Sequence, residues 1–121
     1  MPIVDVQLVG EGSTAPEGLA ARLAEALAHV FSAAIGRVWI RLTVLPIGQY
    51  AENRLDAGEA PLPVFVRVLH ADLPPAEGLA AQAQAVSHAV AACLQCAPEH
   101  VHVEYAPAGR GRIAFGGQLL V

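Results

Sequence analysis

The residue whose type and position most directly suggest chemistry is Pro2. It follows Met1 and precedes an alternating apolar run that extends from Ile3 to Val9. If Met1 is removed, the nitrogen of Pro2 becomes a secondary amine. An α-amino group titrates at about 7.7–8.0, and burial or a neighbouring cation lowers this pKa. A neutral amine at the start of a folded strand would therefore be a general base near pH 7.

The other reactive side chains exclude several kinds of site. The chain has seven arginines, no lysine and a formal net charge of −4. Lysine Schiff-base chemistry is therefore excluded, and binding to a nucleic-acid phosphate backbone is disfavoured. Cys93 and Cys96 lie near the predicted end of a helix, whereas thioredoxin-type pairs begin one, so we interpret them as core cysteines. No further Cys or suitably spaced His completes a zinc site, and we expect no metal and no cofactor.

Length and composition predict one apolar domain that associates with other copies. The chain has 121 residues, of which 55% are hydrophobic and 15% charged. Its mean hydropathy is +0.47. No run approaches the ~20 apolar residues of a spanning helix. The N-terminus lacks the pattern of a signal peptide. We therefore expect a cytoplasmic oligomer rather than a membrane protein.

The chain repeats itself at an offset of 60 residues. Residues 17–21 and 77–81 have the identical sequence EGLAA. The same offset superimposes two alternating apolar runs, and a small insertion aligns a second pair of runs further on. The first pair is Val4, Val6 and Leu8 with Val64, Val66 and Val68, and the second is Val38 and Ile40 with Val101 and Val103. The pattern indicates a tandem duplication.

Each half is predicted to form a strand, a helix and a second strand. Strands are expected at about 3–9, 38–45, 64–69 and 101–105. One helix is expected to begin near Pro16, with Thr14 and Glu17 in capping-box spacing, and the other to span about 75–94. The domain then divides into repeat 1 (about 2–45), a connector (46–62), repeat 2 (about 63–106) and a Gly-rich C-terminal hairpin (107–121).

This element order predicts an α/β fold. A strand–helix–strand unit normally has parallel strands and a right-handed crossover. Two such units side by side form a four-stranded sheet with two helices on one face, and a neighbouring subunit would cover the other face. The ferredoxin-like βαββαβ sandwich has the same element order, and periodicity does not separate the two topologies.

The start Met1-Pro2-Ile3-Val4, the two βαβ repeats and the Gly-rich segment 109–115 together resemble the tautomerase superfamily. The start looks like 4-oxalocrotonate tautomerase, and the segment 109–115 looks like malonate semialdehyde decarboxylase. The resemblance implies a homotrimer with Pro2 at the base of a pocket between subunits. In tautomerase members the proline is an uncharged base, whereas in dehalogenase and decarboxylase members it stays protonated.

Small carboxylates are the usual substrates of this superfamily, and they require a cation. Arg41 is our first candidate, since it shares a strand face with Trp39 near the place where the family's second strand supplies an arginine. Arg110 and Arg112 are further candidates for substrate contact, with an interface ion pair as the alternative. The arginine pair that dehalogenase and decarboxylase members carry after the third strand is missing here.

Four other residues are candidates by position. His29 matches, by distance from Pro2, a histidine of the dehalogenase member, and a solvated helix histidine is the alternative. His70 follows the third strand and could approach the pocket. Tyr50 could donate a hydrogen bond to an enol oxygen, or serve only in structure. Phe115 matches an apolar wall around the proline, which would desolvate the amine and lower its pKa.

Three hypotheses follow. The first is a cofactor-independent keto–enol tautomerase or isomerase in which Pro2 is the base and Arg41 binds the carboxylate. The second is a dehalogenase, hydratase or decarboxylase that depends on His29 and Arg110. The third is a non-enzymatic oligomeric binding module, which a retained Met1 would favour, because the Pro2 nitrogen would then be an amide.

Overall fold

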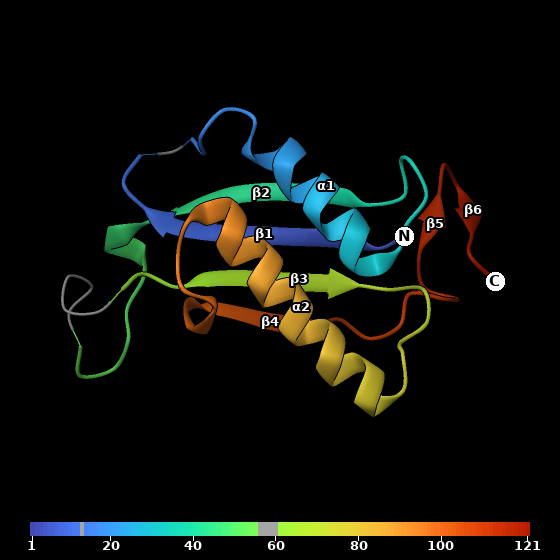
Figure 1. Cartoon of the computed structure of the whole chain (residues 1–121). Helices are drawn as coiled ribbons and strands as arrows, with labels where there is room; N and C mark the ends of the chain where they lie inside the picture. The colour runs from blue at the N-terminus through green and yellow to red at the C-terminus, as the bar shows by residue number, and fades with distance from the viewer. Residues whose placement is uncertain (13, 56–60) are drawn as a thin grey trace.

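The fold is a four-stranded mixed sheet with two helices packed on one face (Figure 1). The computed structural model describes residues 1–12, 14–55 and 61–121. The predicted connector 46–62 therefore lies partly outside the described residues. The elements are β1 (Ile3–Gly10), α1 (Leu19–Phe31), β2 (Trp39–Pro46), η1 (Ile47–Gln49), β3 (Val64–Leu69), α2 (Ala76–Leu94), η2 (Pro98–His100), β4 (Val101–Tyr105), β5 (Ala114–Phe115) and β6 (Gln118–Leu119).

The strand order is β2-β1-β3-β4. Strands β1 and β2 are parallel neighbours, β3 and β4 are parallel neighbours, and the central pair β1 and β3 is antiparallel. Each half is thus a βαβ unit with adjacent strands. The ferredoxin-like alternative, which splits each unit with an intervening strand, is excluded.

The central strand pair shows how the two repeats are related. Val6 lies opposite Val66, which is its equivalent at the 60-residue offset. A pseudo-twofold axis therefore passes between these two residues. The register also corrects the second part of the sequence alignment. Ile40 pairs with Val4 while Val101 pairs with Val64, so Val101 is equivalent to Ile40 and not to Val38.

The core lies between the sheet and the two helices. Alternate residues of β1 and β3 supply the sheet side, and the amphipathic face of each helix supplies the other. Burial of such side chains contributes roughly 1.5–3 kcal/mol each. The core residues with at most 1% exposure are Val4, Val6, Leu19, Leu23, Leu27, Val66, Val68, Val86, Val90 and Ala91.

Helix α1 begins later than predicted. It begins at Leu19, after Gly18 with φ 78°, and its N-cap makes no side-chain hydrogen bond. The capping box at Thr14 and Glu17 is therefore wrong. The first turn is instead closed by the Leu19 amide, which donates to the Pro16 carbonyl at 3.2 Å. Neither helix is long and apolar enough to cross a membrane, as judged over the described part of the chain.

The C-terminal segment forms a small hairpin of β5 and β6 beside the start of the chain (Figure 1). Gly116 and Gly117 form its turn, with φ 58° and 87°. Positive φ at both central residues is the requirement of a type I′ turn, which glycine meets without steric cost.

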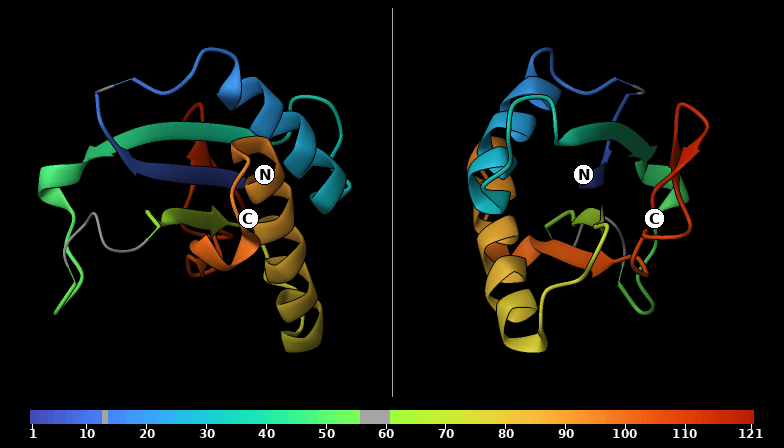
Figure 2. Two further views of the ribbon diagram at one scale, coloured as in Figure 1. Left: turned by 60° about the vertical axis from the view of Figure 1, so that its left-hand side comes forward. Right: turned by 90° about the vertical axis from the view of Figure 1, so that its right-hand side faces the viewer.

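The two faces of the sheet differ. Both helices lie on one face, and no described helix covers the other, which we call the open face (Figure 2). The residues of β2 that point to the open face, Trp39, Arg41 and Thr43, are exposed. The expected division of β2 into two faces is therefore confirmed.

Candidate functional site

A pocket of about 440 Å³ lies at the end of the sheet where the chain begins. We call it the amine pocket, because the amino-terminal residue Met1 lines it. It combines one cation with apolar side chains from both ends of the chain. Its lining residues are Met1, Phe31, Ser32, Ala33, Ala34, Arg37, Ala71, Phe115 and Leu120.

Pro2 follows Met1 and does not itself line this pocket. Its side chain is fully buried, and its carbonyl accepts a hydrogen bond from the Trp39 amide at 3.1 Å. That bond extends the β1–β2 ladder by one residue and fixes the start of the chain against the sheet. The pKa of the Met1 amino group is lowered, first by burial and second by the positive charge of Arg37. Both effects disfavour the ammonium form.

Arg37 is the one cationic side chain that lines the amine pocket, and our sequence reasoning did not select it. It lies in the turn that leads into β2, where its amide donates to the Ala34 carbonyl at 3.1 Å. The parallel pairing of β1 and β2 sets Ile3 opposite Trp39. Two residues before each partner lie Met1 and Arg37, which therefore reach the same pocket. A parallel βαβ unit always brings these two segments to one end of the sheet, and that signal was present in the sequence.

Aromatic side chains form an apolar wall of the amine pocket. Phe115 packs edge-on against Trp39 at 5.1 Å between ring centroids, and Phe31 packs edge-on against His70 at 5.3 Å. Phe115 and Phe31 also line the amine pocket. An apolar wall near an amine favours its neutral form.

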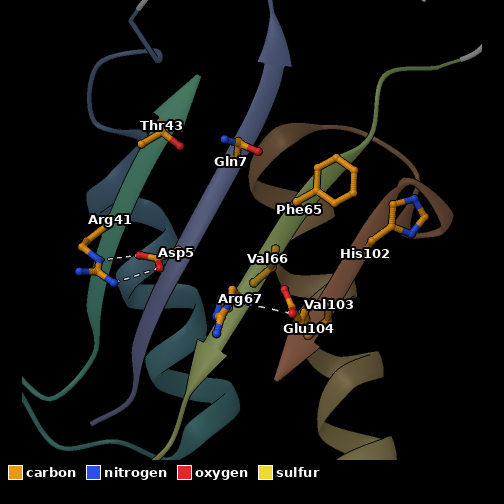
Figure 3. A pocket seen from close by; sticks show the side chains of 10 residues that line it. All are labelled: Asp5, Gln7, Arg41, Thr43, Phe65, Val66, Arg67, His102, Val103 and Glu104. Carbon is orange, nitrogen blue, oxygen red and sulfur yellow. Dashed lines mark hydrogen bonds and ion pairs between the residues drawn. The ribbon is translucent and has the colours of Figure 1, made fainter. Parts of the chain in front are cut away.

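Arg41 lies elsewhere, on the open face (Figure 3). Its guanidinium donates to both carboxylate oxygens of Asp5, at 2.5 Å from Nε and 3.0 Å from Nη2. The pair belongs to a row of alternating charge that crosses all four strands, since Asp5 also lies opposite Arg67 and Arg67 lies opposite Glu104. Arg67 and Glu104 approach to 3.9 Å. The row lines a hollow of about 540 Å³ on this face.

Arg112 shares a second open-face hollow, of about 450 Å³, with Arg41 and Arg67. Ile3 lines this hollow, whereas Met1 lines the amine pocket. Arg41 and Arg112 thus line a common hollow, and neither lines the amine pocket.

Arg110 and His70 make structural contacts near the amine pocket. Arg110 forms a bidentate ion pair with Asp72, at 2.8 and 2.6 Å. His70 Nε2 lies 2.7 Å from Gln82 Oε1, which also accepts a bond from the Tyr105 hydroxyl at 3.0 Å. Burial raises the pKa of that hydroxyl. Neither Arg110 nor His70 lines the pocket, although Ala71 between His70 and Asp72 does.

Neither His29 nor Tyr50 lines the amine pocket. His29 is exposed and lines a separate hollow of about 500 Å³ between the end of α1 and the turn that leads into β2. Tyr50 follows η1 at the opposite end of β2, with its ring 6.1 Å from that of Phe65. Of the predicted site residues, only Phe115 lines the amine pocket.

The cysteines and the metal-binding types of side chain form no second site in the described residues. Cys93 and Cys96 are free thiols, and burial raises the pKa of Cys96. The Cys93 Sγ lies 3.8 Å from the Arg22 carbonyl. No group of three His, Cys, Asp or Glu side chains gathers within residues 1–12, 14–55 and 61–121.

Sequence comparison finds no match, whereas structure comparison finds proteins of similar fold. No protein-family model and no curated protein sequence matches the chain. A fused 4-OT solved as a symmetric trimer has a TM-score of 0.77 at 18% identity, over 98% of this chain and 94% of that one. Pt0534 inactivated by 2-oxo-3-pentynoate has the same TM-score of 0.77, 18% identity and coverage of 98% and 94%.

A malonate semialdehyde decarboxylase inhibited by 3-bromopropiolate is also similar, with a TM-score of 0.70 at 17% identity, over 94% of this chain and 88% of that one. These proteins are members of the tautomerase superfamily. Because the identities are low, the likeness concerns the fold. The chain has the tautomerase fold.

Proposed function

We propose that the protein is a cofactor-independent keto–enol tautomerase of small unsaturated carboxylates, with Pro2 as the general base once Met1 is removed. The observation that carries the proposal is the amine pocket, in which the start of β1 meets one guanidinium and an apolar wall. Proton transfer between carbon and oxygen requires a base, a charge anchor and exclusion of water. Arg37 and the apolar wall would serve as the second and third, and the Pro2 amine would be the base after removal of Met1.

Removal of Met1 would present the Pro2 nitrogen to the pocket that Met1 now lines. The same two influences, burial and the charge of Arg37, would then act on a secondary amine. Both favour the neutral form, which is the form that accepts a proton. A neutral base distinguishes this reading from decarboxylase or dehalogenase chemistry, for which the amine must stay protonated.

Arg37 takes the role that we first gave to Arg41. The Arg41 guanidinium is already occupied by the Asp5 carboxylate, so binding a substrate there would require breaking a bidentate pair. No ion pair of Arg37 is found among the described residues, and its guanidinium can pair bidentately with a substrate carboxylate. With the carboxylate at Arg37, the rest of a small substrate would lie between Pro2 and the wall of Phe31 and Phe115.

We further propose that the active form is a homotrimer. The open face presents a charge row and the exposed rings of Trp39 and Phe65, which a second copy would cover. The fused 4-OT of the same fold is a trimer. The active form can be checked by light scattering at working concentration.

The direct test follows ketonisation of 2-hydroxymuconate and phenylenolpyruvate by ultraviolet absorbance in wild type, Pro2→Ala and Arg37→Ala. Arg41→Ala is the matched control. Intact mass must first show that Met1 is absent. We expect Pro2→Ala and Arg37→Ala to lose activity and Arg41→Ala to keep it. Equal rates in wild type and Pro2→Ala would overturn the proposal, and turnover of malonate semialdehyde alone would move the protein to the decarboxylase chemistry.

Covalent labelling offers a second test that needs no turnover. Pt0534, which has the same fold, is inactivated by 2-oxo-3-pentynoate. We expect this reagent to add once to the processed chain, on the peptide that begins with Pro2, as located by mass spectrometry. Labelling at Cys93 or Cys96 alone would contradict the assignment.

A further inference from the structure

The C-terminal hairpin, residues 109–121, forms one side of the amine pocket. It contributes Phe115 and Leu120 to the lining. Its first residue, Gly109, is buried against the start of the chain. A Cβ at that position would lie 3.2 Å from the Met1 Cε and 3.3 Å from the His70 carbonyl oxygen. Only glycine permits this close approach without displacing a neighbour.

Two backbone hydrogen bonds attach the first residues of the hairpin to the loop between β3 and α2. The Gly109 amide donates to the His70 carbonyl at 2.7 Å, and the Arg110 amide donates to the Ala71 carbonyl at 3.0 Å. These bonds fix only the base of the hairpin. The strands β5 and β6 bond to each other, so the position of the hairpin depends on side chains.

Arg110 makes the side-chain connections at both ends of this segment. Its Nε and Nη2 donate to the two carboxylate oxygens of Asp72, and its Nη1 donates to the Val121 carbonyl at 2.8 Å. The hydrogen bonds between Arg110 and Asp72 raise the pKa of Arg110 and lower that of Asp72. One side chain therefore connects the loop after β3 to the last residue of the hairpin.

We propose that the Asp72–Arg110 pair is a clasp that holds the C-terminal hairpin in register against Trp39, and that Arg110 is thereby a positioning residue for the apolar wall of the amine pocket. Arg110 does not line the pocket and would act only through Phe115 and Leu120. The positional part of this inference is independent of chemistry. Its kinetic consequence rests on the proposed tautomerase function.

Trp39 makes the proposal testable without a substrate. It is the only tryptophan of the chain, it is 45% exposed, and its ring packs edge-on against Phe115. Its fluorescence therefore reports whether the hairpin stays against it, when light scattering shows the same oligomeric state in wild type and variant, because a second copy would also cover Trp39 in the proposed trimer. The variants are Asp72→Arg, Arg110→Asp and the double exchange of both residues. Arg22→Asp is the matched control, since it reverses an arginine on the outside of α1.

We expect acrylamide quenching of Trp39 to rise by up to about twofold in each single variant, because loss of the ion pair loosens the hairpin and Trp39 is already 45% exposed. The double exchange should restore the wild-type value, and Arg22→Asp should not change it. Unchanged quenching in both single variants would overturn the clasp. If a charge reversal prevents folding, as judged by circular dichroism, Arg110→Lys and Asp72→Asn replace it with the same expected direction.

Kinetics test the consequence separately. In Arg110→Asp we expect KM for phenylenolpyruvate to rise by a factor of about two to five, while kcat changes less. The reason is that the phenyl ring of the substrate would pack against the apolar wall. An unaltered KM in a variant with raised quenching would overturn the positioning role. If the wild type shows no tautomerase activity, the fluorescence result still decides the clasp, so the two failures are distinguishable.

Discussion

The two repeats share a frame but differ in what their equivalent ends carry. The first repeat brings Met1, Pro2 and Arg37 to the start of β1 and β2. At the equivalent end of the second repeat, 60 positions on, Pro61 and Leu62 precede β3. Arg37 corresponds by register, 61 positions on, to Pro98 at the start of η2. Duplication therefore reproduces the sheet and helices, whereas the amine and the cation occur once.

The C-terminal hairpin adds to this asymmetry. It lies beside the start of β1 and supplies Phe115 to the amine pocket (Figure 1). The pseudo-twofold axis between Val6 and Val66 sends the equivalent end of the second repeat to the other end of the sheet. Only one end thus gains an apolar wall. The fold therefore determines where the pocket lies, whereas the chain ends and loops supply its reactive and charged groups.

The largest effect should come from the amine itself. We expect Pro2→Ala to lower kcat by about 10² to 10⁴-fold, the range for loss of a positioned general base. The equivalent substitution in the second repeat, Leu62→Ala, should change kcat by less than about twofold, as for residues remote from the reaction. Ketonisation rates of both variants, followed by ultraviolet absorbance, check this. A comparable loss in Leu62→Ala would mean that the two ends are not chemically different.

Core truncation should affect both repeats alike. Leu27→Ala in α1 removes a fully buried side chain, and we expect it to lower the free energy of unfolding by about 2–5 kcal/mol. Val90→Ala in α2 should cost less, at about 1–3 kcal/mol, because a smaller side chain is removed. Urea denaturation measures both. A negligible cost for either would indicate that its helix does not pack on the sheet as described.

Loss of Arg37 should have a smaller effect on rate and a diagnostic effect on pH dependence. We expect Arg37→Ala to lower kcat/KM by about 10- to 100-fold, as for a charge-assisted hydrogen bond. Because the charge of Arg37 lowers the amine pKa, its removal should raise that pKa. Activity that requires the neutral amine would then begin to rise at a higher pH in the variant than in wild type. The kcat/KM profile measures this shift, and Pro98→Ala is the control in the second repeat.

The smallest effect should come from the open face. In the single chain the Arg41 and Asp5 side chains are 67% and 42% exposed, so solvent screens their pair there. We expect Arg41→Ala to lower the free energy of unfolding by about 1 kcal/mol or less and to leave kcat/KM within about twofold. Thermal unfolding and steady-state kinetics check these values. A loss of activity as large as that of Arg37→Ala would return the carboxylate-binding role to Arg41.

The strands and the parallel βαβ units could be predicted because alternating apolar residues determine which strand face is buried. Val4, Val6, Val66 and Val68 are buried in the core as the pattern required. The start of α1 was predicted wrongly. The spacing of Thr14 and Glu17 fits a capping box, but the helix begins at Leu19 after a left-handed Gly18 without a side-chain cap.

The site was less predictable because it depends on register. Strand-face logic selected Arg41, which alternation does place on a common face with Trp39, but that face is the open one. The pairing of Ile3 with Trp39 determines which loop residue reaches the start of the chain, and composition carries no information on it. Phe115 was found through family likeness, since its contact with Trp39 joins segments far apart in sequence.

The central claim is that burial and Arg37 keep the amine at the start of β1 neutral near pH 7. We would measure it by titrating the nitrogen-15 signal of Pro2 in the processed protein, in wild type and in Arg37→Ala. We expect the pKa of the Pro2 amine to lie below the ordinary α-amino range of about 7.7–8.0 in wild type and to be higher in Arg37→Ala. A wild-type pKa within or above that range, unchanged in Arg37→Ala, would contradict it.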